Sequence, residues 1–226
     1  MSLQVLQRDD LPLGGFAGLK EHRLVVDQRV GGGSDTWEGL GNFVYLADAR
    51  FLPKGETKLH PHKEIDVISV MVEGRITHEG SLGHGLSITA DQAQAQRAGG
   101  EGFSHNEINP DEQENRMIQL WVLPEKPGEP ADYRVNNLEL GKLTRIYGGP
   151  KNETEALDSH TIMDVGILFA DQEISKDGEF IAYVTRGGGH LNGEAVHEGD
   201  LVRGDHLKFK AANDNAQIII ITTEQF

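Results

Sequence analysis

The chain has 226 residues, no cysteine and a formal net charge of −15 at pH 7. This length is sufficient for one or two domains with a buried core. The absence of cysteine excludes disulfides, thiolate metal ligands and a cysteine nucleophile, and an acidic surface argues against direct nucleic-acid binding. No apolar run approaches the ~20 residues that span a membrane. The first ten residues lack the pattern of a signal peptide, so we expect a cytoplasmic protein.

Short runs of β-branched and aromatic residues, separated by scattered glycines, indicate an all-β protein. Helical periodicity is weak, and only Lys151–Asp158 is expected to form a helical turn. Regularly spaced short strands favour a sandwich or a barrel. The strongest predicted strands are Asn42–Phe51, Ile65–Val72, Met117–Leu123, Thr161–Phe169, Phe180–Thr185 and Gln217–Thr223.

A proline-rich polar segment, Pro124–Pro130 (PEKPGEP), follows one of these predicted strands. Such segments commonly link domains or run along a surface. We therefore predict an N-terminal barrel over residues 1–126 and a C-terminal barrel over residues 127–226.

A faint internal repeat supports two similar barrels in tandem. The strand ending at Gly74 and the turn at Asp91 have counterparts at Gly187 and Asp200, offset by 113 and 109 residues. The alternative is chance, because turns of this composition are common in all-β chains.

Two short motifs carry the chemistry that the sequence indicates. His60-Pro61-His62 and His105-Asn106-Glu107 are separated by 45 residues. Residues i and i+2 of a strand point to the same side, so each pair can contact one ion. Three imidazoles and a carboxylate suit iron(II), manganese, nickel, copper or zinc and leave coordination positions open. One such motif could arise by chance among ten histidines, but two pairs favour a metal site.

The segments around these motifs resemble the pirin family of the cupin superfamily. The resemblance rests on Pro53–Ser81 (PKGETKLHPHKEIDVISVMVEGRITHEGS), on Ala98–Glu107 and on the strand Gln119–Val122. It implies a bicupin, with two β-barrels facing each other. It also implies one divalent metal ion, expected to be Fe(II), in the first barrel, bound through His60, His62, His105 and Glu107.

The resemblance further implies dioxygen-dependent ring opening of flavonols such as quercetin. Pirins usually carry Arg-Gly-Phe-Glu where this chain has Lys63–Asp66, and an arginine where it has Glu101. The metal-binding positions are intact, so these departures concern the pocket lining and the substrate.

Several other polar residues are candidate metal ligands. Asp66 follows His62 by four positions and is expected to be structural or to support a ligand. No complete ligand set recurs in the second half when the motifs are shifted by the repeat offsets. Two further sets of histidines are His78 and His84, expected to face solvent, and His190, His197 and His206, expected to bind no metal.

Two functional hypotheses follow. The first is a metal-dependent dioxygenase in which Glu107 is both a ligand and the base that accepts a substrate hydroxyl proton. The second is a metal-dependent or redox-dependent regulatory protein that acts through a protein partner without catalysis.

Overall fold

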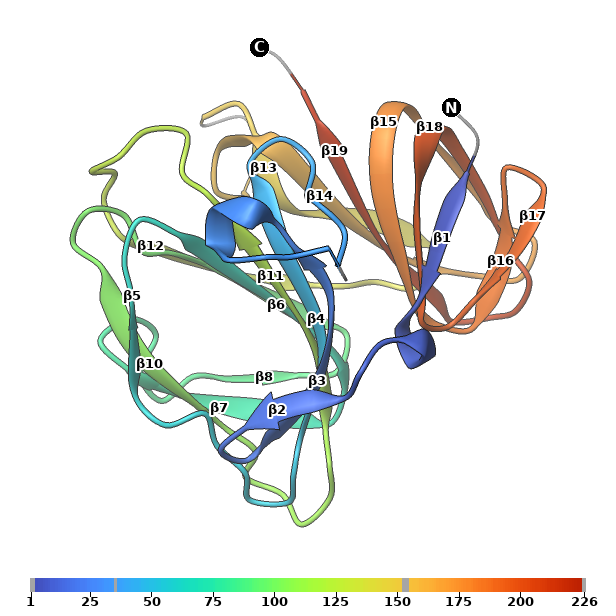
Figure 1. Cartoon of the computed structure of the whole chain (residues 1–226). Coiled ribbons are helices and arrows are strands. Elements are labelled where there is room, and N and C mark those ends of the chain that lie inside the picture. Colours follow the sequence, from blue (N-terminus) through green and yellow to red (C-terminus); the bar gives the residue numbers. More distant parts are fainter. Residues whose placement is uncertain (1–2, 35, 152–154, 225–226) are drawn as a thin grey trace.

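The computed structural model describes residues 3–34, 36–151 and 155–224, and it confirms the all-β bicupin prediction (Figure 1). Two β-barrels lie side by side. The helices in the described part of the chain are two 3-10 turns, η1 (Arg8–Asp10) and η2 (Gln28–Val30). Neither is long or apolar enough to cross a membrane.

The first barrel is built from two sheets. A seven-stranded sheet has the order β12-β9-β6-β11-β4-β3-β2, and a four-stranded sheet has the order β5-β10-β7-β8. The strands are β2 (Gly14–Phe16), β3 (Leu19–Val26), β4 (Phe43–Phe51), β5 (His60–His62), β6 (Asp66–Glu73), β7 (Arg75–Gly80), β8 (Ser87–Thr89), β9 (Gln92–Arg97), β10 (Phe103–Ile108), β11 (Arg116–Val122) and β12 (Asp132–Asn137).

The second barrel is one eight-stranded sheet with the order β13-β14-β19-β15-β18-β16-β17, and β1 pairs with β18. Its strands are β1 (Gln4–Gln7), β13 (Lys142–Gly149), β14 (Ser159–Leu168), β15 (Glu173–Arg186), β16 (Gly188–Leu191), β17 (Glu194–His197), β18 (Asp200–Ala211) and β19 (Ala216–Thr223).

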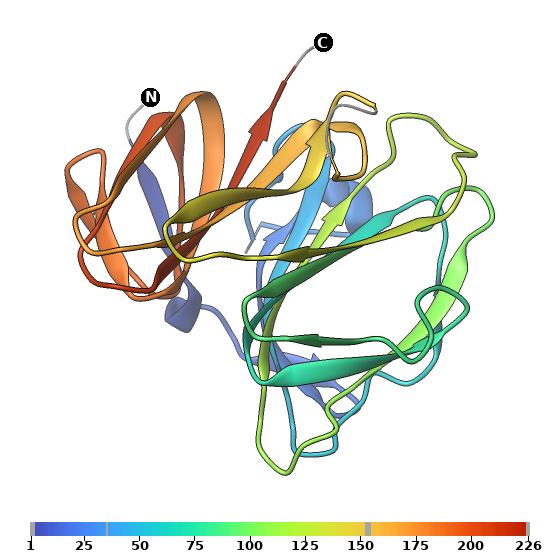
Figure 2. The same ribbon diagram turned by 180° about the vertical axis from the view of Figure 1, so that it is seen from behind.

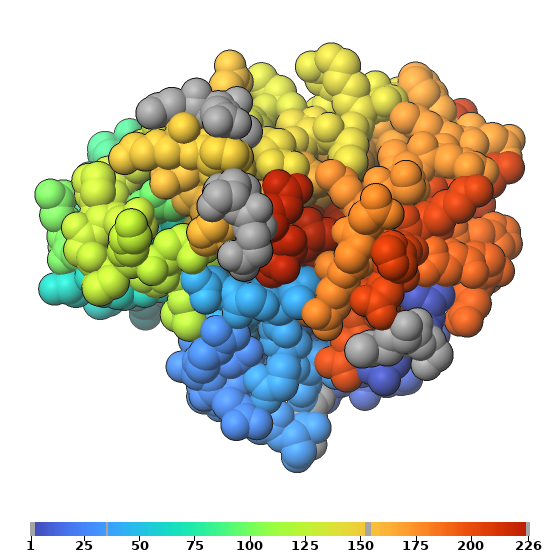
Figure 3. Space-filling model, turned by 90° about the horizontal axis from the view of Figure 1, so that it is seen from above, coloured from blue at the N-terminus to red at the C-terminus, as the bar shows by residue number. Residues whose placement is uncertain are grey.

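Strand pairing crosses the predicted division at residues 126 and 127 in two places. β1 runs antiparallel to β18 of the second barrel, and β12 runs antiparallel to β9 of the first. Seen from behind, the β12 segment runs along the near side of the first barrel before the chain enters the second (Figure 2). From above, the N-terminal segment lies against the strands of the second barrel (Figure 3). Each added strand covers backbone groups that would otherwise form an open edge.

The predicted strands agree with the observed ones to within a few residues, except in β15. This strand begins at Glu173, because the polar segment before Phe180 also pairs with β18. The internal repeat corresponds to two matching runs, β6 to β9 and β15 to β18, with Gly74 and Gly187 both at φ +71 in the first turn. The helical turn predicted over Lys151–Asp158 lies partly outside the described residues, and residues 155–158 form no helix.

The main hydrophobic core lies between the barrels. Strand β6 alternates, so that Ile68, Val70 and Val72 face the second barrel while Ser69 faces the interior of the first. The partners from the second barrel include Met163, Val165, Ile181, Ile219 and Ile221.

Two buried Asp–Arg–Tyr clusters flank this core. Arg116 donates to both carboxylate oxygens of Asp48, at 3.0 and 2.6 Å, and the Tyr183 hydroxyl donates to Asp48 at 2.6 Å. In the second cluster, Asp66 accepts from Arg97 at 3.0 Å and from the Tyr147 hydroxyl at 2.6 Å. Each cluster joins a carboxylate and an arginine of the first barrel to a tyrosine of the second. Asp66 therefore has a structural position at the interface.

Candidate metal centre

Three histidine side chains converge inside the first barrel. Strands β5 and β10 are antiparallel neighbours, and their register places His105 opposite His60 and Phe103 opposite His62. The Nε2 atom of His105 lies 3.1 Å from Nε2 of His62 and 3.0 Å from Nε2 of His60. Among the residues that the structure describes, these three form the group whose ligand atoms lie within 4.8 Å of one another.

Burial keeps two of these imidazoles neutral. His105 is fully buried, whereas His60 and His62 are partly exposed. Burial, with a contribution from neighbouring histidines, lowers the pKa of His62 to about 4 and the pKa of His105 to about 2. Neutral imidazole is the form that donates a lone pair to a metal ion.

Glu107 lies on the same face of β10 as His105 and is fully buried. Its Oε1 atom accepts a hydrogen bond from Ser69 Oγ at 3.4 Å, and its Oε2 atom has no hydrogen-bond partner. Burial raises the pKa of Glu107 to about 7. Its carboxylate does not belong to the 4.8 Å group within the described part of the chain, so its role as fourth ligand stays a prediction.

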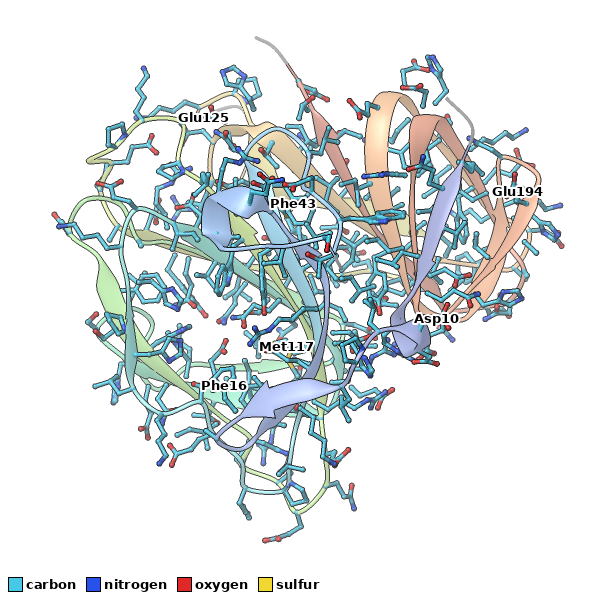
Figure 4. The ribbon with its side chains drawn as sticks, in the orientation of Figure 1. Asp10, Phe16, Phe43, Met117, Glu125 and Glu194 are labelled. Carbon is cyan, nitrogen blue, oxygen red and sulfur yellow. The ribbon has the colours of Figure 1, made fainter. Side chains whose placement is uncertain are left out.

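The walls around the histidines combine aromatic and polar side chains. Tyr45 and Trp121 stack with ring centroids 4.1 Å apart, and the Trp121 ring lies 6.1 Å from that of His62. The buried Trp121 indole nitrogen has no hydrogen-bond partner. Side chains project into the first barrel from its strands, and Met117 of β11 lies among them (Figure 4). Aromatic and polar groups therefore lie together beside the histidine cluster.

A hollow of about 280 Å³ opens beside His62. Its lining includes Lys63 and Glu101, two of the positions at which the sequence departs from the usual pirin pattern. Both side chains are exposed. These two departures therefore concern the surface beside the histidine cluster, whereas Asp66 is buried at the interface between the barrels.

The prediction that His78 faces solvent is wrong. Its side chain is buried, and its Nε2 atom lies 2.9 Å from Nδ1 of His105. The period of strand β7 explains the burial, because His78 shares an inward face with Ile76 two residues earlier. That alternation was the signal in the sequence. His84 is exposed, as predicted.

The histidines of the second half stay apart from the cluster. His190, His197 and His206 are exposed on the second barrel. Asp66, at the interface, also points away from the cluster.

Comparison with known proteins shows which families the chain is similar to. Residues 35–122 match the pirin family model. A Zymomonas mobilis protein named as a candidate quercetin 2,3-dioxygenase is 26% identical over 193 residues, which cover 77% of this chain and 80% of that protein. The quercetin 2,3-dioxygenase of Escherichia coli K12 is 27% identical over 107 residues, about half of each chain.

A solved structure extends the likeness to both barrels. The bacterial pirin YhhW of Escherichia coli, determined in complex with nickel(II), superposes with a TM-score of 0.83 at 16% identity and covers 99% of this chain and 100% of that one. At this identity the superposition shows the fold alone. Residues 35–122 thus carry a match to the pirin family model, and the fold of the chain is that of a bacterial pirin.

Proposed function

We propose that the chain binds one divalent metal ion through His60, His62, His105 and Glu107 and acts as a flavonol-type dioxygenase. The observation that carries this proposal is the convergence of three Nε2 atoms, with the two His105 distances at 3.0 and 3.1 Å. Iron(II) is the ion that we propose. Copper, nickel, manganese and zinc also suit nitrogen and oxygen ligands.

The donor set fits such an ion. Buried polar atoms normally have partners, and Oε2 of Glu107 has none although it is fully buried. A cation near the three imidazoles would satisfy this oxygen and favour the ionised carboxylate. When bound, the metal would act as a Lewis acid that polarises a substrate oxygen.

The protein residues would then select and activate the substrate. A flavonol presents a ketone beside an acidic hydroxyl, and Glu107 would accept the hydroxyl proton. Burial raises the pKa of this carboxyl group, and a bound cation would lower it again and keep the carboxylate ionised, ready to accept the proton. The stacked Tyr45 and Trp121 rings offer an aromatic wall for a planar substrate.

The test is activity after loading with iron(II), copper, nickel or manganese, followed by quercetin absorbance and by oxygen uptake. We expect oxygen-dependent loss of quercetin, and a decrease of about 10²-fold for Glu107→Gln, as is typical for removal of a general base. His190→Gln, on the second barrel, is the control and should retain full activity. Absence of turnover with every metal, while the metal stays bound, would reject the dioxygenase.

One observation favours the second hypothesis, a metal-dependent regulator. The net charge of −15 suits a basic protein partner. This hypothesis predicts that the amount of partner recovered in a pull-down depends on the oxidation state of the bound metal. Partner binding that is independent of metal would argue against it.

A further inference from the structure

His78 lies behind His105, on the side of that ring opposite to His60 and His62. It comes from β7, which pairs with β10 in a register that places His78 opposite Glu107. The side chain is 1% exposed. Its ring meets the His105 ring edge-on, at a centroid distance of 5.0 Å and an angle of 78°. His78 therefore contacts the histidine cluster through the His105 ring.

The surrounding atoms define the direction of the His78–His105 hydrogen bond. Nδ1 of His78 lies 3.3 Å from the carbonyl oxygen of Gly83, which can only accept, so this nitrogen carries the proton. Burial disfavours a second proton on the ring. Nε2 of His78 is then an acceptor with two donors, Nδ1–H of His105 at 2.9 Å and the Gln96 amide nitrogen at 3.2 Å, and the contact with His105 is the shorter.

We infer that His78 is a positioning residue that holds His105 in the Nδ1–H tautomer and leaves its Nε2 lone pair directed at the metal position. This inference rests on the proposed metal site and deepens it. In the opposite tautomer, the Nε2 proton of His105 would point at His60 and His62 and would prevent ligation. A hydrogen-bond partner on the remote nitrogen fixes both tautomer and orientation in metal-binding histidines.

His60 has the same arrangement with a simpler partner. Its Nδ1 atom lies 2.8 Å from the carbonyl oxygen of Lys58, so Nδ1 donates and Nε2 is free of hydrogen. Two of the three imidazoles thus have their lone pairs selected by contacts outside the cluster. His105 is buried more deeply than His60, and its partner is the side chain of His78, which can be changed by mutation.

Three neighbours hold His78 in place. The Gln96 amide nitrogen lies 3.2 Å from Nε2 of His78, and the Tyr133 ring is nearly parallel to the His78 ring at 6.4 Å. Gly83 has φ +71, and a Cβ atom there would lie 3.2 Å from Nδ1 of His78 and from the Tyr133 ring. A side chain at position 83 would therefore press on the ring that it now supports.

The tautomer can be measured without metal. In protein labelled with ¹⁵N in histidine, long-range ¹H–¹⁵N correlation spectra distinguish a protonated from an unprotonated ring nitrogen. We expect His105 to show a protonated Nδ1 and an unprotonated Nε2 at neutral pH, assigned by loss of its signals in His105→Ala. A protonated Nε2 on His105 would overturn the inference.

Metal affinity provides the second test, with nickel(II) and iron(II) as probes in competition with a chelator. His78→Phe keeps the ring and removes the acceptor, and we expect binding to weaken about 10- to 100-fold. His78→Gln offers an amide oxygen to His105 and should recover most of that loss. His84→Gln is the matched control, because His84 is an exposed histidine of the same hairpin, and it should bind as the unsubstituted protein does.

The two proposals can fail separately. If the unsubstituted protein binds no metal, the proposed function fails, and the tautomer spectrum still decides the role of His78. If His105→Ala abolishes binding while His78→Phe changes neither affinity nor the His105 spectrum, only the role of His78 is rejected. Should His78→Phe not fold, His78→Gln and the spectrum of the unsubstituted protein remain decisive.

Discussion

The first barrel has a group of buried polar side chains in its interior, beside apolar residues such as Ile76 and Met117, that the interior cluster of the second barrel lacks. In the first barrel, buried interior residues include Ser69, Gln94, Gln96, His105 and Glu107. In the second barrel, the interior cluster is apolar and includes Phe180, Val184, Phe209, Ile218 and Ile220. Both barrels use the same alternation of strand residues, and both direct their other face to a shared core.

The difference indicates where a ligand belongs. Burying polar groups costs free energy unless they find partners, and an apolar filling is the simpler way to stabilise a barrel. Both barrels contain buried atoms without a hydrogen-bond partner, such as Nε2 of Gln217 in the second. Those of the first barrel include Oε2 of Glu107, on the strand that carries His105, and Nε1 of Trp121, whose ring lies 6.1 Å from that of His62. The second barrel is filled by its own side chains and stabilises the assembly by packing.

The largest expected effect comes from breaking the histidine cluster. His60→Ala or His105→Ala should abolish metal binding, because each removes a nitrogen from a small chelate. Elemental analysis of the purified protein should give about one metal per chain before the change and none after it. Two metals per chain, or full retention in both variants, would show that the site lies elsewhere.

The shared interface should be the next most sensitive region. Arg116 is fully buried and bound to Asp48, so Arg116→Met leaves that buried carboxylate with Arg8, at 3.2 Å, as its charged partner. The change should cost about 3 kcal/mol in the free energy of unfolding, measured in urea. Arg50→Met is the control on β4, because its pair with Glu73 is exposed and should contribute under about 1 kcal/mol. Equal losses in the two variants would contradict the importance of burial.

The same pair predicts a pH dependence. Burial opposes ionisation of Asp48, but hydrogen bonds and the charge of Arg116 outweigh it and lower the pKa of Asp48 below its usual value. A lowered folded-state pKa contributes stability above the unfolded pKa of about 4, and that contribution is lost as the pH falls through the folded value. The destabilisation by Arg116→Met should therefore shrink in acid; a constant difference down to pH 2 would exclude this linkage.

Smaller changes inside each barrel should separate stability from binding. Ile220→Val in the second barrel should cost about 1 kcal/mol of unfolding free energy and leave metal affinity unchanged. Ser69→Ala in the first barrel removes the hydroxyl that donates to Glu107 and should weaken metal binding as well as stability. Chelator competition measures the metal affinity of both variants, and urea denaturation measures their stability. A lower metal affinity of Ile220→Val would contradict the separation of stability from binding.

The smallest effect is expected from the second-barrel histidines. Replacing His190, His197 and His206 together by glutamine should leave metal content and activity nearly unchanged, since all three are exposed. A large loss of either would reveal a contribution from the second barrel to the site.

The sequence by itself determined the local features of this protein. Period-two alternation and β-branched runs located strands such as β4, β11 and β19, because those signals depend only on neighbouring residues. The motifs at His60 and His105 identified candidate ligands for the same reason. The repeat also anticipated the two matching strand runs.

The tertiary structure alone decided how distant segments pair. The antiparallel register of β5 and β10 brings His105 to His60 and His62, and packing of β7 against β10 buries His78 behind them. The exchange of β1 and β12 across the predicted boundary is equally non-local. The alternation of side chains along a strand shows which residues share a face. Which residues that face contacts is decided by strand register and by packing, because both depend on contacts between residues far apart in the chain.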